Sequence, residues 1–451
     1  MPQKSNRKYG VRLSLDHSEA PYVINDWPNL SEMKILIVGA GMSGLLFAGL
    51  CQRMGVQYEV FERSESFKRS GGVMSLNAGI LPALEQLGIY EKLVEKSYPV
   101  FSSAVVDERN GRQFELRIKG YKERCSDKQE HHGTLLVGAD GAHSHVRQCL
   151  YEILSSKKLL SPENSESFKG LSITLAGTTG PLPVEDFKNV NEAFSSFTQT
   201  IGKDKPYSWS TFSVPGNRVC WSVHKQITVE EYQDIVFRKS NWGPEAIDDM
   251  VHEVRDLQTF YGSTVGTLID YTPKESISKI CTEEKVFTTW HYGRTVLIGD
   301  AAHKILPSAG QGVVNAMQDA VVLANCLYDL KVLSREQFDF AFKRYQELRM
   351  PHVMEQYEAS KRLAKMLYNQ KWYHVWCRRI FFEHASEDTK AKNFLIDAGY
   401  QPQIGFIPLV PIRGNIAITG RQECQRYVEE TGASSHHFQG NSVLDSAAVA
   451  L

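Results

Sequence analysis

Three glycines at fixed spacing are the first residues in the chain whose pattern predicts a chemical role. Gly39, Gly41 and Gly44 form the pattern G-x-G-x-x-G directly after an apolar run. In a strand–turn–helix unit these glycines permit a tight turn, let the backbone approach a pyrophosphate and allow close packing of the helix on the strand. Glu62 ends the next apolar run, where an acidic side chain binds the ribose of adenosine. The pattern therefore predicts a dinucleotide-binding site.

A second glycine-rich turn lies within residues 295–320. A short apolar run stops at Asp300, and Gly310 and Gly312 precede a helical pattern that begins at Val313. Glycines at the start of a helix let backbone N–H groups face a ligand, and the helix N-terminus adds positive potential there. Asp300, at the carboxyl end of a strand, can accept hydrogen bonds from the hydroxyl groups of a sugar-like chain. The alternative is an ordinary strand–turn–helix unit with Asp300 as a cap.

A third turn carries an acid and an arginine. The apolar run at residues 135–138 leads into a small-residue turn with Asp140, and Arg147 follows shortly after. We expect Asp140 to anchor the turn and Arg147 to point toward a phosphate or a carboxylate. His143 and His145 are interpreted as polar surface residues.

A parallel sheet is needed to bring these turns together. Residues 34–38 and 56–61 are typical of buried strands, and the helical pattern at 45–54 connects them into a βαβ unit. The apolar runs at 135–138 and 296–298 supply further strands, each with a turn at its carboxyl end. The chain is therefore predicted to have an α/β fold.

A strand-rich stretch precedes the turn at Asp300. Residues 207–214 and 218–224 alternate and are rich in β-formers, and Pro215-Gly216-Asn217 joins them, which predicts a hairpin. Such a unit, inserted between two parts of a dinucleotide fold, is a natural wall for a substrate pocket. Tyr207 is a candidate acid or base beside the substrate, although a tyrosine of the sheet core is the alternative. The aromatic side chains that either line the pocket or pack in the sheet core are Tyr207, Trp209, Phe212 and Trp221.

Further segments are expected to frame these units. Strands are predicted at residues 101–106 and 114–118, joined by a turn at Asn110-Gly111. From residues 171–177 onward the residue pattern differs from that of the preceding part of the chain. Helices are predicted at residues 75–88, 229–239, 244–257, 313–330, 334–350 and 352–367. Residues 372–382 are aromatic and basic, which suits a core helix end, a membrane-touching face or part of a substrate mouth.

Composition limits the classes of function. The chain has 451 residues, of which 42% are hydrophobic and 23% charged, as in an ordinary globular protein with two domains or one elaborated domain. Its net charge of -1 gives no reason to expect nucleic acid as a partner. Eight cysteines occur without a C-x-x-C pair or a Cys/His cluster, which argues against a zinc site or a disulfide framework and for a reducing compartment, so no metal and a cytoplasmic location are expected. We expect neither a signal peptide nor a transmembrane helix, and peripheral membrane contact stays open.

Together the three turns resemble the group A flavoprotein monooxygenases, the aromatic-hydroxylase-like family. The motifs are GAGMSG with Glu62, GADGAHSHVR at 138–147 and GDAAHKILPSAGQG at 299–312. The hairpin and the run GQGVVNAMQDA look closest to fungal FAD-dependent monooxygenases of secondary metabolism, and the resemblance covers most of residues 33–330. It implies a glutathione-reductase-type, Rossmann-like FAD-binding domain with an inserted antiparallel-sheet substrate domain and C-terminal helices.

The resemblance also implies how the chain is divided. The expected parts are a polar leader at 1–32, the FAD-binding domain at 33–165 and 285–345, the substrate domain at 166–284, C-terminal helices with an extended segment at 346–421, and a polar tail at 422–451.

Cofactor contacts follow from the resemblance in the same way. The ADP half of FAD is expected near the first glycine turn, the ribityl chain at Asp300 and the flavin ring beside Gly312, where backbone N–H groups can stabilise the negative charge of reduced flavin. Asp140 and Arg147 belong to a motif that serves FAD and NADPH together. The expected cofactor-binding residues are Gly39, Gly41, Gly44, Glu62, Arg63, Ser75, Asp140, Arg147, Asp300, Gly310, Gly312 and Val313.

The implied function is that of an FAD-dependent monooxygenase. NADPH or NADH acts as a transient reductant without a Rossmann domain of its own, and O2 forms a flavin hydroperoxide that hydroxylates or epoxidises a hydrophobic small molecule. Two alternatives stay open: a flavin-dependent dehydrogenase or oxidase that shares the fold but transfers no oxygen, and a catalytically impaired paralogue that is retained for binding.

One interval departs from the family pattern. The stretch from Gly39 to Asp140 is shorter than the resemblance implies, and the shortening falls between Gly72 and Gly138, near residues 121–125. Family members carry there an FAD-contacting arginine in an R-x-x-L-like helix start, which no residue of this chain matches. Three explanations are open: the loss is tolerated, the sequence is an abbreviated gene product, or the affinity for FAD is weak.

Overall fold

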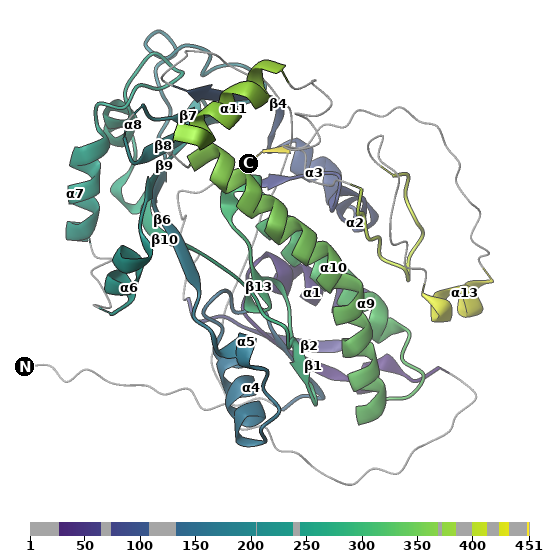
Figure 1. Cartoon of the computed structure of the whole chain (residues 1–451). Coiled ribbons are helices and arrows are strands. Elements are labelled where there is room, and N and C mark those ends of the chain that lie inside the picture. The colour runs from purple at the N-terminus through teal and green to yellow at the C-terminus, as the bar shows by residue number, and fades with distance from the viewer. Residues whose placement is uncertain are drawn as a thin grey trace, which may run out of the picture.

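The computed structural model describes residues 27–64, 74–107, 132–203, 205–237, 244–368, 372–384, 399–412, 424–432 and 449–450. Two β-sheets with helices packed on them form this part of the chain (Figure 1). The smaller sheet carries the predicted glycine turns, and the larger one contains the predicted hairpin.

The first sheet has five strands in the order β11-β12-β5-β1-β2. They are β1 (Lys34–Val38), β2 (Gln57–Phe61), β5 (Leu135–Gly138), β11 (His291–Tyr292) and β12 (Thr295–Leu297). Strands β12, β5, β1 and β2 are parallel, and β11 is antiparallel to β12. The carboxyl ends of the parallel strands therefore meet at one edge, which is where α/β sheets bind ligands. The predicted α/β fold is confirmed.

Two helices pack on each other beside the first sheet. They are α1 (Met42–Arg53) and α9 (Gly312–Tyr328). Phe47 and Leu50 of α1 and Val321 of α9 are completely buried. Burying an apolar side chain of this size stabilises a fold by about 1.5–3 kcal/mol. This packing holds the N-termini of both helices next to the strand ends that they follow.

The second sheet has nine strands in the order β13-β10-β6-β9-β8-β7-β4-β14-β3. They are β3 (Ser75–Leu76), β4 (Tyr98–Asp107), β6 (Lys169–Thr178), β7 (Ser195–Ile201), β8 (Tyr207–Val214), β9 (Arg218–Gln226), β10 (Ile277–Val286), β13 (His303–Lys304) and β14 (Val449–Ala450). Its neighbouring strands are antiparallel, except that β4 and β7 are parallel. The predicted hairpin is confirmed as β8–β9, with Gly216 and Asn217 at positive φ in its turn.

The two faces of the second sheet differ in polarity. Trp209 and Trp221 point into an apolar cluster with α7 (Pro244–Val254) and α8 (Val265–Asp270). The other face lies toward α10 (Arg335–Tyr368), which contacts β8 and β10 on the side opposite α7 and α8 (Figure 1). The strand register places these polar side chains on the face toward α10: Ser208, Ser210, Ser222, His224 and Thr174.

Residues 75–88 do not form the predicted single helix. Strand β3 ends at Leu76, the Asn77 side chain then accepts the N–H of Gly79 at 2.9 Å, and α2 (Leu81–Gln86) begins only after this turn. The predicted apolar positions are buried at Ile80, Leu81 and Leu84. The apolar spacing therefore predicts the buried positions, but an asparagine side chain that accepts the backbone N–H two residues further on favours a turn over a helix.

Residues 334–367 form one helix instead of the predicted two. Helix α10 continues through Pro351. A proline in a helix interior removes one backbone hydrogen bond and costs about 3 kcal/mol, so packing must offset this cost. Arg349 and Val353, on either side of the proline, are both completely buried.

Several shorter elements complete the described fold. They are η1 (Leu30–Glu32), α3 (Tyr90–Val94), α4 (His145–Ser156), α5 (Pro162–Ser165), α6 (Val229–Phe237), η2 (Lys274–Ser276), η3 (Gly299–Ala301), η4 (Pro307–Ala309), α11 (Trp372–His384) and α13 (Gln425–Thr431). The predicted strand at 101–106 lies in β4, whereas its predicted partner at 114–118 lies outside the described residues. Within the described ranges no helix is both long and apolar enough to cross a bilayer.

Candidate cofactor site

The first glycine turn has a geometry that only glycine allows. Gly39 has φ +107°, and its N–H donates to the Phe61 carbonyl at 2.7 Å. A Cβ on Gly39 would lie 2.3 Å from the Ala139 carbonyl oxygen, and one on Gly44 would lie 2.0 Å from the Gly39 carbonyl oxygen. Both contacts are shorter than any side chain tolerates, so these glycines hold β1, β5 and α1 in close contact.

Gly41 lies in the same turn but has open space in front of it. It precedes α1, and an added Cβ would meet only the Ala139 carbonyl oxygen, at 4.0 Å. The α1 N-terminus is therefore accessible to a ligand, and the helix dipole favours a negatively charged one. This arrangement fits a pyrophosphate group.

Glu62 lies directly beside the first glycine turn. Its carboxylate accepts the N–H of Ala40 and the N–H of Ser64, both at 2.9 Å. A carboxylate has about four lone-pair positions, so hydroxyl groups of a ribose can still donate to it. The neighbouring Arg63 is exposed.

The second predicted turn follows β12 and contains Asp300. Gly299 adopts φ +62° and begins η3, in which Asp300 forms an ion pair with Lys304. The Asp300 side chain is 29% exposed, so its carboxylate remains accessible. Strand β13 (Figure 1), which directly follows this turn, is an edge strand of the second sheet.

The start of α9 is open in the same way as the start of α1. Gly310 has φ +64°, and a Cβ on it would lie 3.2 Å from the Ser75 hydroxyl oxygen, which brings Ser75 to this turn. A Cβ on Gly312 would meet no atom within 4 Å. Val313 is half-buried in the first turn of α9. The backbone N–H groups at this helix start can therefore face a ligand.

Asp140 anchors the third turn as predicted. Its carboxylate accepts the Ser144 hydroxyl at 2.6 Å and the backbone N–H groups of His145 and Val146 at 2.7 and 3.2 Å. These bonds satisfy donors at the start of α4 that have no partner within the helix.

Arg147 has partners other than the predicted phosphate or carboxylate. Its guanidinium donates to the carbonyls of Ala301 at 2.9 Å and Ala142 at 2.7 Å, and its Cζ lies 4.0 Å from the centre of the Phe287 ring. Burial lowers the pKa of Arg147 from its usual value. The side chain thus ties the third turn to the residue that follows Asp300.

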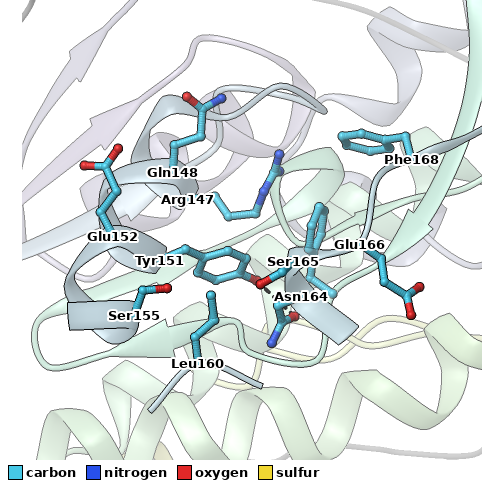
Figure 2. Close-up of a pocket in the computed structure, with 11 residues that line it drawn as sticks. Arg147, Gln148, Tyr151, Glu152, Ser155, Leu160, Asn164, Ser165, Glu166 and Phe168 are labelled. Atoms are coloured by element: carbon cyan, nitrogen blue, oxygen red, sulfur yellow. Dashed lines mark hydrogen bonds between the residues drawn. The ribbon is translucent and has the colours of Figure 1, made fainter. Parts of the chain in front are cut away.

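A pocket of about 420 Å³ opens beside Arg147, between α4 and α5 (Figure 2). In Figure 2 the Tyr151 hydroxyl points toward Asn164, at 3.3 Å, and it also donates to the Thr289 carbonyl at 2.8 Å. Of the predicted site residues only Arg147 lines this pocket. Most of the predicted contacts therefore lie elsewhere, at the three strand ends.

The position of Tyr207 does not favour its predicted catalytic role. Its ring is buried in the apolar cluster under α7, and its hydroxyl donates to Glu253 of that helix. Lys225 donates to the same carboxylate at 2.7 Å. Tyr207, Trp209 and Trp221 thus pack in the sheet core, which was the alternative interpretation of these aromatic residues.

A chain of polar side chains on the opposite face was missed by the sequence analysis. His224 bonds through Nδ1 to Thr174 at 2.8 Å and through Nε2 to Ser222 at 3.1 Å. The chain continues from Ser222 to Ser210 at 2.7 Å and from Thr174 to Thr282 at 2.9 Å. The alternation of these residues with core aromatics is the sequence signal that could have revealed them.

A buried ion cluster beneath Asp300 was also missed. Asp319 of α9 contacts His303 at 2.6 Å and Arg349 of α10 at 2.8 Å, and each of the three side chains is at most 1% exposed. A signal was present in the sequence, because Asp319 is the one charged residue in the helical stretch 312–328.

Comparison with known families identifies the kind of domain. A family model described as FAD binding domain matches residues 32–120 and 108–360. The two matched pieces overlap at residues 108–120, within the interval between Gly72 and Gly138 that is shorter than the family resemblance implies. Residues 108–131 of this interval lie outside the described residues.

Curated relatives carry FAD-dependent activities in their names. The FAD-dependent monooxygenase paxM of Penicillium paxilli is 27% identical over 397 residues, which cover 74% of this chain and 79% of that protein. The FAD-dependent monooxygenase atmM of Aspergillus flavus is 26% identical over 438 residues, which cover 83% of this chain and 87% of that protein. These matches confirm the resemblance to fungal FAD-dependent monooxygenases that the motifs indicated.

A solved structure has the same fold. Klebsiella pneumoniae HpxO, in a complex with FAD and uric acid, is similar with a TM-score of 0.61 and 16% identity. The similarity covers 81% of this chain and 96% of that chain. The predicted combination of a Rossmann-like domain with an inserted sheet is therefore confirmed as a fold.

Proposed function

The chain belongs to the FAD-binding-domain family, and on this basis we propose that it is an FAD-dependent monooxygenase. It uses NADPH or NADH and O2 to hydroxylate or epoxidise a hydrophobic small molecule, in secondary metabolism. The observation that carries the proposal is the alignment of three turns at the carboxyl ends of the adjacent parallel strands β1, β5 and β12. The FAD-dependent relatives support the same reaction class.

The residues at these turns fit FAD. Gly41 and the α1 N-terminus would hold the pyrophosphate, Glu62 would accept from the adenosine ribose, and Asp300 would accept from the ribityl chain. The accessible Asp300 carboxylate and the open space before Gly312 support these roles. The remaining proposed cofactor contacts are Gly39, Gly44, Arg63, Ser75, Asp140, Arg147, Gly310 and Val313.

FAD would supply the activation of O2 and the oxygen transfer, while the chain binds, orients and shields the reactants. The N–H groups at the start of α9 would stabilise negative charge at the flavin ring. Besides its proposed contact with the cofactor, Arg147 would hold two of the turns together, because its guanidinium donates to the carbonyls of Ala301 and Ala142.

The face of the second sheet toward α10 is the proposed substrate wall. Ser208 has a completely buried hydroxyl without a hydrogen-bond partner among the described residues. A buried polar atom of this kind usually bonds to water or a ligand. Ser210, Ser222 and His224 on the same face would orient a polar group of an otherwise hydrophobic substrate.

Peripheral membrane contact is proposed for α11. Tyr373, Trp376 and Ile380 of this helix are 41%, 60% and 38% exposed, and Trp and Tyr are enriched at membrane interfaces. Cosedimentation of the protein with phosphatidylcholine vesicles should decrease in the variant Trp376→Ser, while Phe340→Ser on α10 serves as a control that is equally exposed, at 61%. Equal cosedimentation of the two variants would contradict this contact. The proposed location is cytoplasmic.

Oxygen transfer is tested by isotope labelling. The FAD-loaded protein is incubated with NADPH, ¹⁸O2 and a panel of hydrophobic aromatic compounds and alkenes, and the products are analysed by mass spectrometry. Incorporation of one labelled oxygen atom per product is expected. Substrate oxidation without label would show a dehydrogenase or oxidase, and stable binding of FAD without any turnover across the panel would favour the impaired paralogue.

A further inference from the structure

A buried carboxylate joins the turn at Asp300 to two helices. One oxygen of Asp319 accepts the Gly299 N–H at 2.8 Å and bonds to Nε2 of His303 at 2.6 Å. Its other oxygen accepts Nε of Arg349 at 2.8 Å. Gly299 directly precedes Asp300, so the carboxylate is bonded to the backbone of the turn that would hold the ribityl chain.

The same arginine continues the network to the start of α9. Nη2 of Arg349 donates to the side-chain oxygen and the backbone carbonyl of Asn315, at 2.9 and 3.2 Å. The Asn315 side chain in turn donates to the carbonyl of Gln311 at 3.0 Å. Gln311 directly precedes Gly312, which is the residue expected beside the flavin ring.

A second residue of α10 reaches the same turn. Tyr345, one helical turn before Arg349, donates its hydroxyl to the carbonyl of Leu297 at 3.2 Å. Leu297 is the last residue of β12. Helix α10 therefore contacts the backbone at the end of β12 through Tyr345. Its Arg349 also bonds to Asp319 of α9, which accepts the backbone N–H of Gly299.

The charges of this cluster compensate one another. Burial raises the pKa of Asp319, but His303 and Arg349 outweigh this effect and the carboxyl pKa lies below its usual value. Burial lowers the pKa of Arg349, but Asp319 outweighs it and the guanidinium pKa lies above its usual value. Asp319 and Arg349 are thus both ionised at neutral pH, which makes their hydrogen bonds directional and strong.

We propose that Asp319 and Arg349 are positioning residues for the flavin, which fix the Asp300 turn and the α9 N-terminus relative to each other. This inference rests on the proposed FAD site. Neither residue belongs to the three glycine turns, and neither touches the cofactor in this account. They act through Gly299 on one side and through Asn315 and Gln311 on the other.

The test separates positioning from stability with a matched pair of variants. Arg349→Lys keeps the charge but cannot bond Asp319 and Asn315 with the same planar geometry. Arg378→Lys on α11 is the control, because Arg378 is 2% exposed and donates to the Met366 carbonyl at 2.8 Å. For each full-length variant the measurements are the dissociation constant of FAD, the visible absorption spectrum of the bound flavin and the Tm of the FAD-free protein.

Arg349→Lys is expected to raise the dissociation constant of FAD by about tenfold, because the loss of one charge-assisted hydrogen bond weakens binding by about this factor. It should also shift the flavin absorption bands, whereas Arg378→Lys should lower only the Tm. Equal FAD affinities and spectra in the two variants would overturn the proposal. Absence of FAD binding by the unaltered protein would instead overturn the proposed function.

A double variant covers the case in which Arg349→Lys does not fold. Asp319→Asn with Arg349→Gln removes both buried charges together, so that neither one is left as a buried charge without its partner. A folded double variant that binds FAD about tenfold more weakly supports the positioning role. A folded double variant with unchanged FAD affinity would refute that role. Failure of both variants to fold would also refute it, since the pair would then serve the fold itself.

Discussion

At the scale of single residues, the glycine turn after β1 is the most constrained part of the site. Gly44 lies against the Gly39 carbonyl, whereas a Cβ on Gly49, also in α1, would meet no atom within 4 Å. These two glycines in one helix therefore differ in their tolerance of a methyl group, which allows a controlled test.

The variant Gly44→Ala should weaken FAD binding by about tenfold or more, because the turn must shift and backbone hydrogen bonds to the pyrophosphate are lost. The variant Gly49→Ala should bind FAD normally and gain about 0.5–1 kcal/mol in the free energy of unfolding. Fluorescence titration with FAD and chemical denaturation measure the two effects. Equal FAD affinity in both variants would be inconsistent with the proposed role of the turn.

His224 is the residue for which the structure predicts a pH effect. Burial lowers its pKa to about 4, from a usual value of 6.5. At acidic pH the unfolded chain then binds a proton that the folded protein does not bind, so the folded state loses stability as the pH falls.

Between pH 6.5 and about 4 the free energy of unfolding should fall by about 3 kcal/mol on account of His224, and above pH 6.5 this contribution should be constant. Chemical denaturation of the unaltered protein and of His224→Gln at several pH values checks this. The variant lacks the titrating group, so its stability should vary less over this range. If the free energies of unfolding of the two proteins changed with pH in parallel, the lowering of the His224 pKa by burial would be excluded.

At the scale of elements, the sequence analysis identified most of the first sheet. Its strands are buried apolar runs that end in glycine turns, and both signals are local. The single helix predicted at residues 75–88 was wrong, because the apolar spacing suits a helix but the Asn77 side chain favours a turn. The helix end predicted at Pro351 was also wrong, because tertiary packing offsets the hydrogen bond that the proline removes.

The proline inside helix α10 allows a prediction about the stability of this element. Pro351 is exposed within a continuous helix, so the variant Pro351→Ala restores a backbone donor without disturbing the core. The free energy of unfolding should rise by about 1–2 kcal/mol. Chemical denaturation measures this change, and an unchanged or lower stability would mean that residues 334–367 are two helices with a break at Pro351.

At the scale of the whole molecule, long-range contacts explain what the sequence could not reveal. The ion pair of Asp319 with Arg349 spans 30 positions, and the Arg147 bond to Ala301 spans 154. No local pattern encodes such partners, so the sequence analysis expected a phosphate or carboxylate for Arg147 and no role for Asp319. For a related reason the sequence could not decide between the two interpretations of Tyr207, because alternation in a strand does not say which face a helix covers.

The three turns at the strand ends together form the proposed flavin site, and FAD retention tests this claim most directly. The purified full-length protein is supplied with FAD, dialysed extensively and examined by absorption spectroscopy, with Gly44→Ala treated in the same way. The account predicts that the unaltered protein keeps the visible flavin bands at a stoichiometric level and that the variant loses them. A colourless unaltered protein would contradict the account.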